Sequence, residues 1–316
     1  MSVPIYNSVQ ENPTLQGGDE LNSDMSSSLE KPRLLRRGGC HYINGNYLPE
    51  SKAVISVLDI GLLRGFGVFD FLVTYNNRPF LIDRHIDRLF NSAKILGLTI
   101  GKTKREIESI VNNTLSKNIN GKEKTIRILI TGGVGNSSTE PSAKASIIVI
   151  VEDRHFYPNA LFENGAKALS YKYSRPFPEI KSLEYSVAIK ALNLAKKSGC
   201  IEAVYYDEKS GNITEATTSN VFIVKNKQIY TSDNKILFGI TRDLVISLCH
   251  IIYPVRKRPI KLSDIFSADE VFLTASNKEV MPVVKVDKKK IGNGKVGHVT
   301  KDVIQLFRNF VEKGKW

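Results

Sequence analysis

Hydrophobic and polar positions follow two periods along the chain and divide it into short strands and amphipathic helices. Apolar residues that recur every three or four positions indicate helices, whereas short runs rich in Val, Ile and Phe indicate strands. A hairpin is expected over residues 41–48, because Asn44-Gly45 separates two extended runs. Further strands are expected at residues 67–75, from Leu81 onwards, and at 125–131, 146–151, 166–173, 203–206, 219–224, 228–230 and 270–274. Helices are expected at residues 84–98, 105–115, 184–198, 241–252 (with Thr241 as N-cap) and 299–311.

The order of these elements predicts a tail followed by two domains. Residues 1–40 are rich in Ser, Asn, Gly and Pro, which favours a mobile tail or an arm over a partner subunit. Residues 41–155 read as a smaller α/β (α+β) domain, and residues 153–164 as its connection to the next one. Residues 156–316 mix many short strands with helices, which indicates a larger α/β domain of the pseudo-barrel kind.

Charge narrows the class of partner. The chain carries 45 Lys and Arg against 32 Asp and Glu, a formal net charge of +13. The first 40 residues hold four basic and five acidic residues, so the excess belongs to the rest of the chain. Such an excess suits nucleic acid, an anionic membrane surface or a phosphorylated small molecule.

Other features exclude several classes. No apolar run is long enough to span a membrane, and the five histidines show no metal-binding spacing. The first basic residue is Lys31 and no early apolar segment precedes it, so we expect no secretory signal. Three widely spaced cysteines suit a reducing compartment, and we expect a cytoplasmic protein without a metal ion.

Three stretches combine residue types that bind anions or carry out chemistry. Residues 214–220 place three consecutive hydroxyl side chains near a carboxylate, an arrangement that also suits a plain hairpin turn. Residues 238–242 put a glycine before a helix N-terminus, which is either a phosphate site or an ordinary helix cap. Lys181 ends a proline-restricted segment; it is either a surface lysine or the amine that forms a Schiff base with an aldehyde cofactor.

Taken together, six stretches resemble the fold type IV family of pyridoxal 5′-phosphate enzymes. Branched-chain aminotransferases, D-amino acid aminotransferases and aminodeoxychorismate lyases belong to this family. The six stretches, in the family's order, are Gly65–Asp70, His85–Leu89, Ile180–Leu183, Ile213–Asn220, Gly239–Asp243 and Glu279–Val283. The resemblance implies a pyridoxal 5′-phosphate cofactor and a homodimer, or a higher homo-oligomer, with its active site at the domain interface near the partner subunit.

The resemblance also assigns cofactor-binding roles. Lys181 matches the Schiff-base lysine, which then moves the substrate's α-proton. Glu215 matches the carboxylate that faces the pyridine nitrogen, and Arg88 the arginine that binds the phosphate. The rest of the phosphate cup is implied at Thr217, Thr218, Ile240 and Thr241.

Substrate preference is less sharply indicated. Thr125-Ile126-Arg127 resembles a run of the branched-chain enzymes and suggests that Arg127 meets a distal carboxylate, with an exposed strand residue as the alternative. Arg64 and Phe71 replace a tyrosine and a glycine of that group, and Tyr185 is one position out of register. The expected substrate-binding residues are Arg64, Phe69, Arg127, Thr274, Ala275 and Ser276.

We therefore expect an aminotransferase that uses branched-chain L-amino acids and 2-oxoglutarate. The alternatives within the family are a D-amino acid or (R)-amine aminotransferase and an aminodeoxychorismate lyase. A non-catalytic binder of nucleic acid or an anionic surface is the alternative of another class. Because no RNA-binding aromatic signature, zinc finger or basic helix is present, we expect small-molecule partners and neither nucleic acid nor a membrane.

Overall fold

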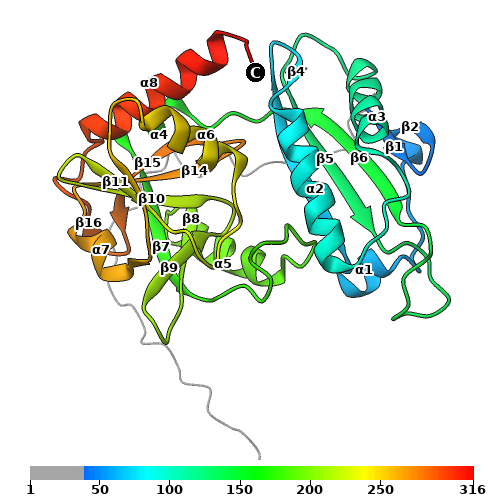
Figure 1. The fold of residues 1–316 in the computed structure, drawn as a ribbon, viewed down its shortest axis with the longest axis horizontal. Helices are drawn as coiled ribbons and strands as arrows, with labels where there is room; N and C mark the ends of the chain where they lie inside the picture. Colours follow the sequence, from blue (N-terminus) through cyan, green and yellow to red (C-terminus); the bar gives the residue numbers. More distant parts are fainter. Residues whose placement is uncertain (1–38) are drawn as a thin grey trace, which may run out of the picture. The chain divides into compact units, whose positions relative to one another are not determined.

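Two β-sheets, each accompanied by helices, organise the chain, one in each half of the sequence (Figure 1). The structure, a computed structural model, describes residues 39–316. Almost all of the expected tail, residues 1–38, therefore lies outside the described residues.

The first sheet has six antiparallel strands in the order β2-β1-β6-β5-β3-β4. Its strands are β1 (Cys40–Ile43), β2 (Asn46–Pro49), β3 (Gly67–Tyr75), β4 (Arg78–Pro79), β5 (Lys124–Thr131) and β6 (Ser146–Asp153). Its helices are the 3₁₀ turn η2 (Glu50–Lys52), α1 (Ile60–Arg64), α2 (Ile82–Leu96) and α3 (Lys104–Ser116). Apolar side chains of α2 and α3 pack with those of β3, β5 and β6 in one core.

Strand β5 shows how the sequence pattern gives this sheet two faces. Ile126, Ile128 and Ile130 are fully buried in the core with α2 and α3. The alternating positions between them, which include Arg127, are only half-buried. Because side chains of a strand alternate between faces, Arg127 lies on the face away from that core.

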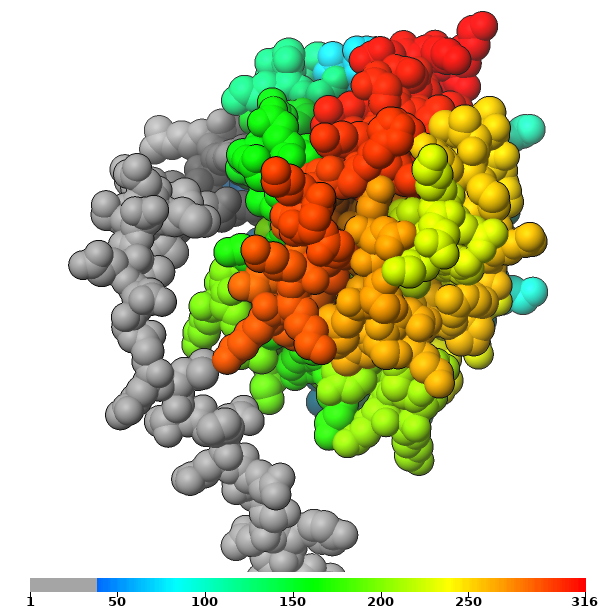
Figure 2. Space-filling view, turned by 90° about the vertical axis from the view of Figure 1, so that its left-hand side faces the viewer, coloured from blue at the N-terminus to red at the C-terminus, as the bar shows by residue number. Residues whose placement is uncertain are grey.

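The second sheet is mixed, with the order β12-β11-β10-β14-β15-β7-β8-β9-β13 and β16 paired to β15. Its strands are β7 (Ala166–Lys172), β8 (Glu202–Tyr206), β9 (Asn212–Ala216), β10 (Asn220–Lys225), β11 (Gln228–Thr231), β12 (Val255–Lys257), β13 (Ile260–Lys261), β14 (Glu270–Ala275), β15 (Glu279–Val286) and β16 (Lys289–Lys290). Its helices are α4 (Asn159–Asn164), α5 (Ser186–Lys197), α6 (Ile240–Cys249), α7 (Leu262–Ser267) and α8 (His298–Glu312). On the face drawn in Figure 2, the last third of the chain, yellow to red, covers most of the surface. Within this part of the chain, helix α6 packs against helix α8.

Most expected helices and strands are confirmed. The short elements η2, α1, β9, β12, β13, α7 and β16 were not expected, and four further differences follow. Leu81 does not open a strand: it adopts a left-handed backbone (φ 52°) and precedes α2, while the strand is Arg78–Pro79. Gly239, not Thr241, is the N-cap of α6. Strand β15 was not expected and contains Pro282, a residue that is uncommon inside strands. The expected connection contains helix α4. The division into domains near residue 155 stays a prediction.

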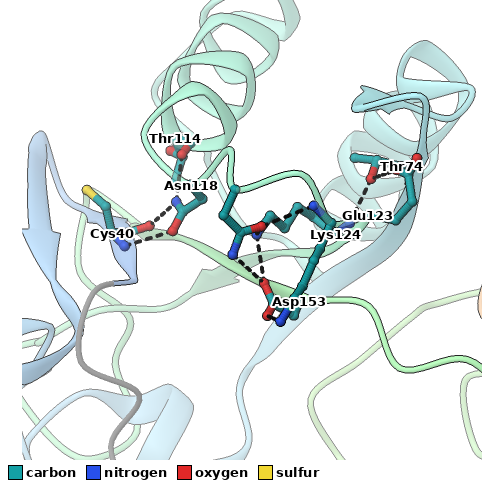
Figure 3. A network of polar contacts seen from close by, with 9 residues as sticks. Cys40, Thr74, Thr114, Asn118, Glu123, Lys124 and Asp153 are labelled. Atoms are coloured by element: carbon teal, nitrogen blue, oxygen red, sulfur yellow. Dashed lines mark hydrogen bonds and ion pairs between the residues drawn. The ribbon is translucent and has the colours of Figure 1, made fainter.

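Polar side chains fix the ends of four strands of the first sheet (Figure 3). Lys124, almost fully buried, donates to Asp153 at 2.7 Å and to Asn120 at 2.6 Å, which joins β5 to β6. The Asn118 amide bonds both the N–H and the carbonyl of Cys40, at 2.9 and 2.7 Å, as a neighbouring strand would. Thr74 Oγ1 of β3 accepts a hydrogen bond from the Lys124 backbone N–H at 2.7 Å. The Asn118 and Thr74 contacts thus satisfy backbone groups at the starts of β1 and β5.

A fully buried carboxylate joins β3 to α2. Asp70 accepts hydrogen bonds from His85 Nδ1 at 2.6 Å and from Arg88 Nε and Nη2 at 2.9 and 2.8 Å. Burial by itself would raise the pKa of Asp70, but the charge of Arg88 and the contact with His85 outweigh it and hold that pKa well below its usual range. Asp70 is therefore ionised in the folded protein.

We predict that Asp70→Asn lowers the free energy of unfolding by about 3 kcal/mol at neutral pH, because it leaves the largely buried Arg88 without a counter-charge. Urea denaturation measures the change. The matched control is Asp87→Asn on the exposed side of α2, where the pair with Lys104 is solvent-exposed and the loss stays under about 0.5 kcal/mol.

The effect of Asp70→Asn depends on pH with a definite sign. The folded-state pKa of Asp70 is lower than its ordinary value of 3.8, so the stabilisation is complete above about pH 4 and is lost as the pH falls through the folded pKa. Equal losses in the two variants at pH 7 would contradict the role given to Asp70.

Candidate active site

A cavity of about 380 Å³ collects most of the residues that the sequence singles out. Twelve of the thirteen predicted site residues line it: Phe69, Arg88, Arg127, Lys181, Glu215, Thr217, Thr218, Ile240, Thr241, Thr274, Ala275 and Ser276. They come from β3, α2 and β5 of the first half and from loops, strands and helix α6 of the second half. Residues more than 200 positions apart thus share one pocket.

Arg64 is the predicted residue that the structure does not bring to this cavity. It ends α1 and is exposed, and its guanidinium donates to Ser138 Oγ at 3.2 Å and to the Leu63 carbonyl at 3.1 Å. Gly65, with a left-handed backbone (φ 67°), ends the helix at this point. Within a single chain, Arg64 therefore contacts the loop at Ser138 and not the pocket.

The backbone around Lys181 is held as if it were an additional strand beside β3. Phe69 N donates to the Lys181 carbonyl at 2.8 Å, and Leu183 N donates to the Gly67 carbonyl at 3.0 Å. Val68 and Ser182 form an antiparallel bridge between these two bonds. Lys181 is thereby fixed at the pocket wall by main-chain hydrogen bonds.

The Lys181 amine is a desolvated cation without a counter-ion in direct contact. Among the described residues its Nζ makes neither a hydrogen bond nor an ion pair, and it lies 4.6 Å from the centre of the Phe69 ring. Burial and then the positive charge of Arg88 lower the pKa of Lys181 to about 8. An amine with that pKa is neutral far more often at neutral pH than an ordinary lysine, so it can act as a nucleophile or a base.

Glu215 is held at the pocket wall by Arg175, a residue without a predicted role. Arg175 Nη1 donates to Glu215 Oε1 at 2.7 Å, and the Leu237 N–H donates to Glu215 Oε2 at 3.0 Å. The same guanidinium bonds the carbonyls of Phe177, Pro178 and Ile180. It therefore ties the carboxylate to the segment that ends at Lys181.

The first turn of α6 offers donors for an anion. The N-cap residue Gly239 has no side chain to bond the N–H groups of that turn. A Cβ at Gly239 would lie 2.1 Å from Asn220 Oδ1, so only glycine allows this close approach. Arg88, while paired with Asp70, also reaches the Phe238 carbonyl just before the helix, at 3.3 Å.

Threonine hydroxyls beside this helix differ in what they can bind. Thr217 Oγ1 and Thr274 Oγ1 are buried and have no hydrogen-bond partner within residues 39–316. Thr218 Oγ1, in contrast, is engaged by Lys278 at 2.7 Å and by Glu202. The two unpartnered hydroxyls point to a ligand with polar groups.

Three tyrosines missed as site residues also line the cavity: Tyr173, Tyr185 and Tyr205. Burial raises the pKa of Tyr185 to about 12, and its ring packs edge-on against Phe69 at 5.4 Å. Burial likewise raises the pKa of Tyr205, whose hydroxyl has no partner among the described residues. These phenols stay protonated at neutral pH and can donate to an anionic oxygen.

Clusters of metal-ligating side chains and membrane-spanning helices are both absent from residues 39–316. No group of three or more His, Cys, Asp or Glu side chains in that range is placed to hold a metal ion. No helix in this part of the chain has the length and apolar character that crossing a membrane requires.

Known proteins match this chain over most of its length. Residues 67–286 match the family of class IV amino-transferases. A putative branched-chain-amino-acid aminotransferase of Methanocaldococcus jannaschii is 37% identical over 87% of this chain and 96% of its own length. The D-alanine aminotransferase of Staphylococcus haemolyticus is 31% identical over 86% of this chain and 97% of its own.

Solved structures resemble it as well. The T.th. branched-chain amino acid aminotransferase with pyridoxamine 5′-phosphate superposes with a TM-score of 0.81 at 28% identity, over 87% of this chain and 94% of that one. The Escherichia coli branched-chain enzyme gives a TM-score of 0.79 at 26% identity, over 86% and 94%. The two-sheet α/β architecture is thus the fold type IV architecture expected from the sequence. The chain belongs to the class IV aminotransferase family.

Proposed function

We propose that this protein is a pyridoxal 5′-phosphate-dependent aminotransferase that converts branched-chain L-amino acids with 2-oxoglutarate as acceptor. One observation carries the proposal: Lys181, a desolvated amine with a lowered pKa, shares a pocket with a fixed carboxylate, Glu215, and with the open first turn of α6. The relatives named above support transamination of an amino acid.

The residues present fit the cofactor at both of its ends. A phosphate needs several donors, and the N-terminus of α6, Arg88 and the unpartnered Thr217 hydroxyl provide them. Glu215, held in one position by two hydrogen bonds, would supply the anion that a protonated pyridine nitrogen requires. The buried, unpartnered hydroxyls are the structural sign that a polar ligand belongs here.

When bound, pyridoxal 5′-phosphate supplies an aldehyde carbon that takes up the amino group and a ring that accepts electrons from the substrate's Cα. Lys181 Nζ holds the cofactor between turnovers and removes and returns the proton at the substrate's Cα. The burial that lowers the pKa of this amine leaves roughly a tenth of it neutral at pH 7, against well under a hundredth for an ordinary lysine.

Glu215 would keep the ring nitrogen of a bound cofactor protonated, and Arg175 keeps Glu215 oriented. Because Arg175 also bonds the carbonyls just before Lys181, one guanidinium sets the distance between the base and the carboxylate. The protonated Tyr185 hydroxyl, at the same wall, donates to an oxygen of the bound ligand. These residues orient the reacting groups and exclude water from them.

The pocket also suits an apolar substrate side chain. Phe69, Phe71, Val187 and Ala188 line it, and Ala275 and Ser276 complete the wall near β14. Arg127 lies on the same sheet face as Phe71, where a distal carboxylate of glutamate would find a cation. Apolar surface for one substrate and a cation for the other are what a branched-chain donor and 2-oxoglutarate require.

A second candidate is an enzyme for D-amino acids. It is favoured by the 31% identity to a D-alanine aminotransferase over nearly the whole chain. In the two candidates the substrate's carboxylate and side chain would exchange places in the pocket. A comparison of L- and D-amino acids as donors distinguishes them.

We predict that the purified protein with pyridoxal 5′-phosphate forms glutamate from L-leucine and 2-oxoglutarate. Coupled detection of glutamate measures the rate, with D-leucine and D-alanine as parallel donors. Lys181→Ala lowers the rate by at least about 10⁴-fold and abolishes the near-visible absorbance of the bound cofactor. Glutamate from D-alanine alone would replace the proposal with the second candidate, and a protein that pyridoxal 5′-phosphate does not colour would end it.

We also propose that the protein is a homodimer and, from the sequence alone, cytoplasmic. Val54, Val57, Leu58 and Leu62 are each at least 60% exposed, on the segment between η2 and α1 and on α1 itself. Arg64 ends this same segment. Contiguous exposed apolar side chains of this kind mark protein–protein contacts.

Leu62→Asp is therefore expected to convert the dimer to a monomer at micromolar concentration, because it places a charge in an apolar interface. Light scattering coupled to size-exclusion chromatography gives the mass. Ile251→Asp, a change at an equally exposed apolar residue after α6, serves as the control and leaves the mass unchanged. A monomeric wild-type protein, or a dimeric Leu62→Asp variant, would rule out this interface.

A further inference from the structure

Arg127 does not face the pocket as an isolated cation, because Glu152 pairs with it. Arg127 Nη1 donates to Glu152 Oε2 across the β5–β6 pair. In the strand register Arg127 lies opposite Ile150 and Thr125 opposite Glu152, so the pair is a diagonal contact on one sheet face. Both side chains are partly buried, 38% and 23% exposed, and water therefore screens the pair incompletely.

The rest of the Arg127 side chain is directed to the cavity. Arg127 lines the pocket and packs its guanidinium over the ring of Phe71, 5.4 Å from its centre. Phe71 is its direct neighbour on β3. Within the described residues, Nε and Nη2 of Arg127 make no hydrogen bond, so two of its nitrogens can still meet a ligand.

We propose that Glu152 is a specificity-determining residue that sets the balance between dicarboxylate and apolar substrates. The proposal rests on the function proposed above. With Glu152 ionised, the pair carries no net charge, so an apolar side chain beside it leaves no cation unpaired. A distal carboxylate gains the hydrogen bonds of Arg127 but lies close to the charge of Glu152, and like charges at such a distance repel.

The pair thus lowers the affinity for glutamate and 2-oxoglutarate relative to that for leucine and its oxo acid. Specificity of this kind comes from a repulsive element added to an attractive one. Glu152 touches Arg127 and does not line the cavity itself, so its charge acts on a carboxylate that Arg127 holds nearby.

The test uses two substrate analogues without an amino group, glutarate and 4-methylpentanoate, which share one carboxylate and differ at the other end. Isothermal titration calorimetry on the protein loaded with pyridoxal 5′-phosphate gives the ratio of their dissociation constants. Glu152→Gln is expected to shift this ratio toward glutarate by roughly three- to ten-fold. Glu163→Gln, which removes the same charge from an exposed position on α4, leaves the ratio unchanged.

A double-mutant cycle separates this role from a structural one. Without Arg127 the distal carboxylate is no longer held near Glu152, so Glu152→Gln shifts the ratio less in an Arg127→Gln background than in the wild-type protein. An unchanged ratio in the single variant, or an equal shift without Arg127, overturns the proposal. Should Glu152→Gln fail to fold, Glu152→Asp, which keeps the charge but shortens the side chain, is expected to give a smaller shift of the same sign.

Failure of the proposed function would look different. If the proposed function is wrong, no glutamate forms from leucine. The ratio of the dissociation constants of the two analogues is measured without any catalytic turnover. A protein that does not transaminate leucine but shows the Arg127-dependent shift keeps the role of Glu152. A protein that transaminates leucine without the shift loses it.

Discussion

A desolvated lysine without a counter-ion is the constraint around which the pocket is built. The other cations of the cavity each have a carboxylate partner: Arg88 pairs with Asp70, Arg175 with Glu215, and Arg127 with Glu152. Lys181 has none within hydrogen-bonding distance among the described residues, and burial together with Arg88 lowers its pKa. Each arginine charge is therefore balanced by a carboxylate, whereas the Lys181 amine has no such partner and is the reactive group of the pocket.

The fold produces this arrangement by bringing distant segments to one wall. Hydrogen bonds to Phe69 and Gly67 hold the backbone of Lys181 against β3. Asp70, on the same strand, faces the core side and fixes Arg88 on α2. Arg175 connects the carboxylate at the end of β9 to the turn before Lys181. The six-stranded sheet thus contributes the anchor for the base, and the ten-stranded sheet contributes the carboxylate and the helix N-terminus.

Sequence reasoning found the residues that belong to local motifs and missed the residues that pair with them. Lys181, Glu215 and the Gly239 turn stand in short stretches whose composition suggests chemistry. Arg175 lies 40 positions from its partner in a proline-rich turn, and nothing local marks that pairing. A buried carboxylate such as Glu215 needs a cationic partner. The sequence does not indicate which of the 45 Lys and Arg residues is that partner. Arg64 was singled out from the resemblance as well, but it does not line the pocket of its own chain, so its substrate role stays a prediction.

A measurement of the pKa of Lys181 tests most directly whether this amine is desolvated and lacks a counter-ion. The rate at which cyanate carbamylates each lysine of the cofactor-free protein can be followed by mass spectrometry across pH, with the exposed Lys190 as reference in the same sample. We predict a titration midpoint of about 8 for Lys181. A midpoint near the ordinary lysine value of 10.5 would contradict it, because the amine would then be neither desolvated nor destabilised by Arg88.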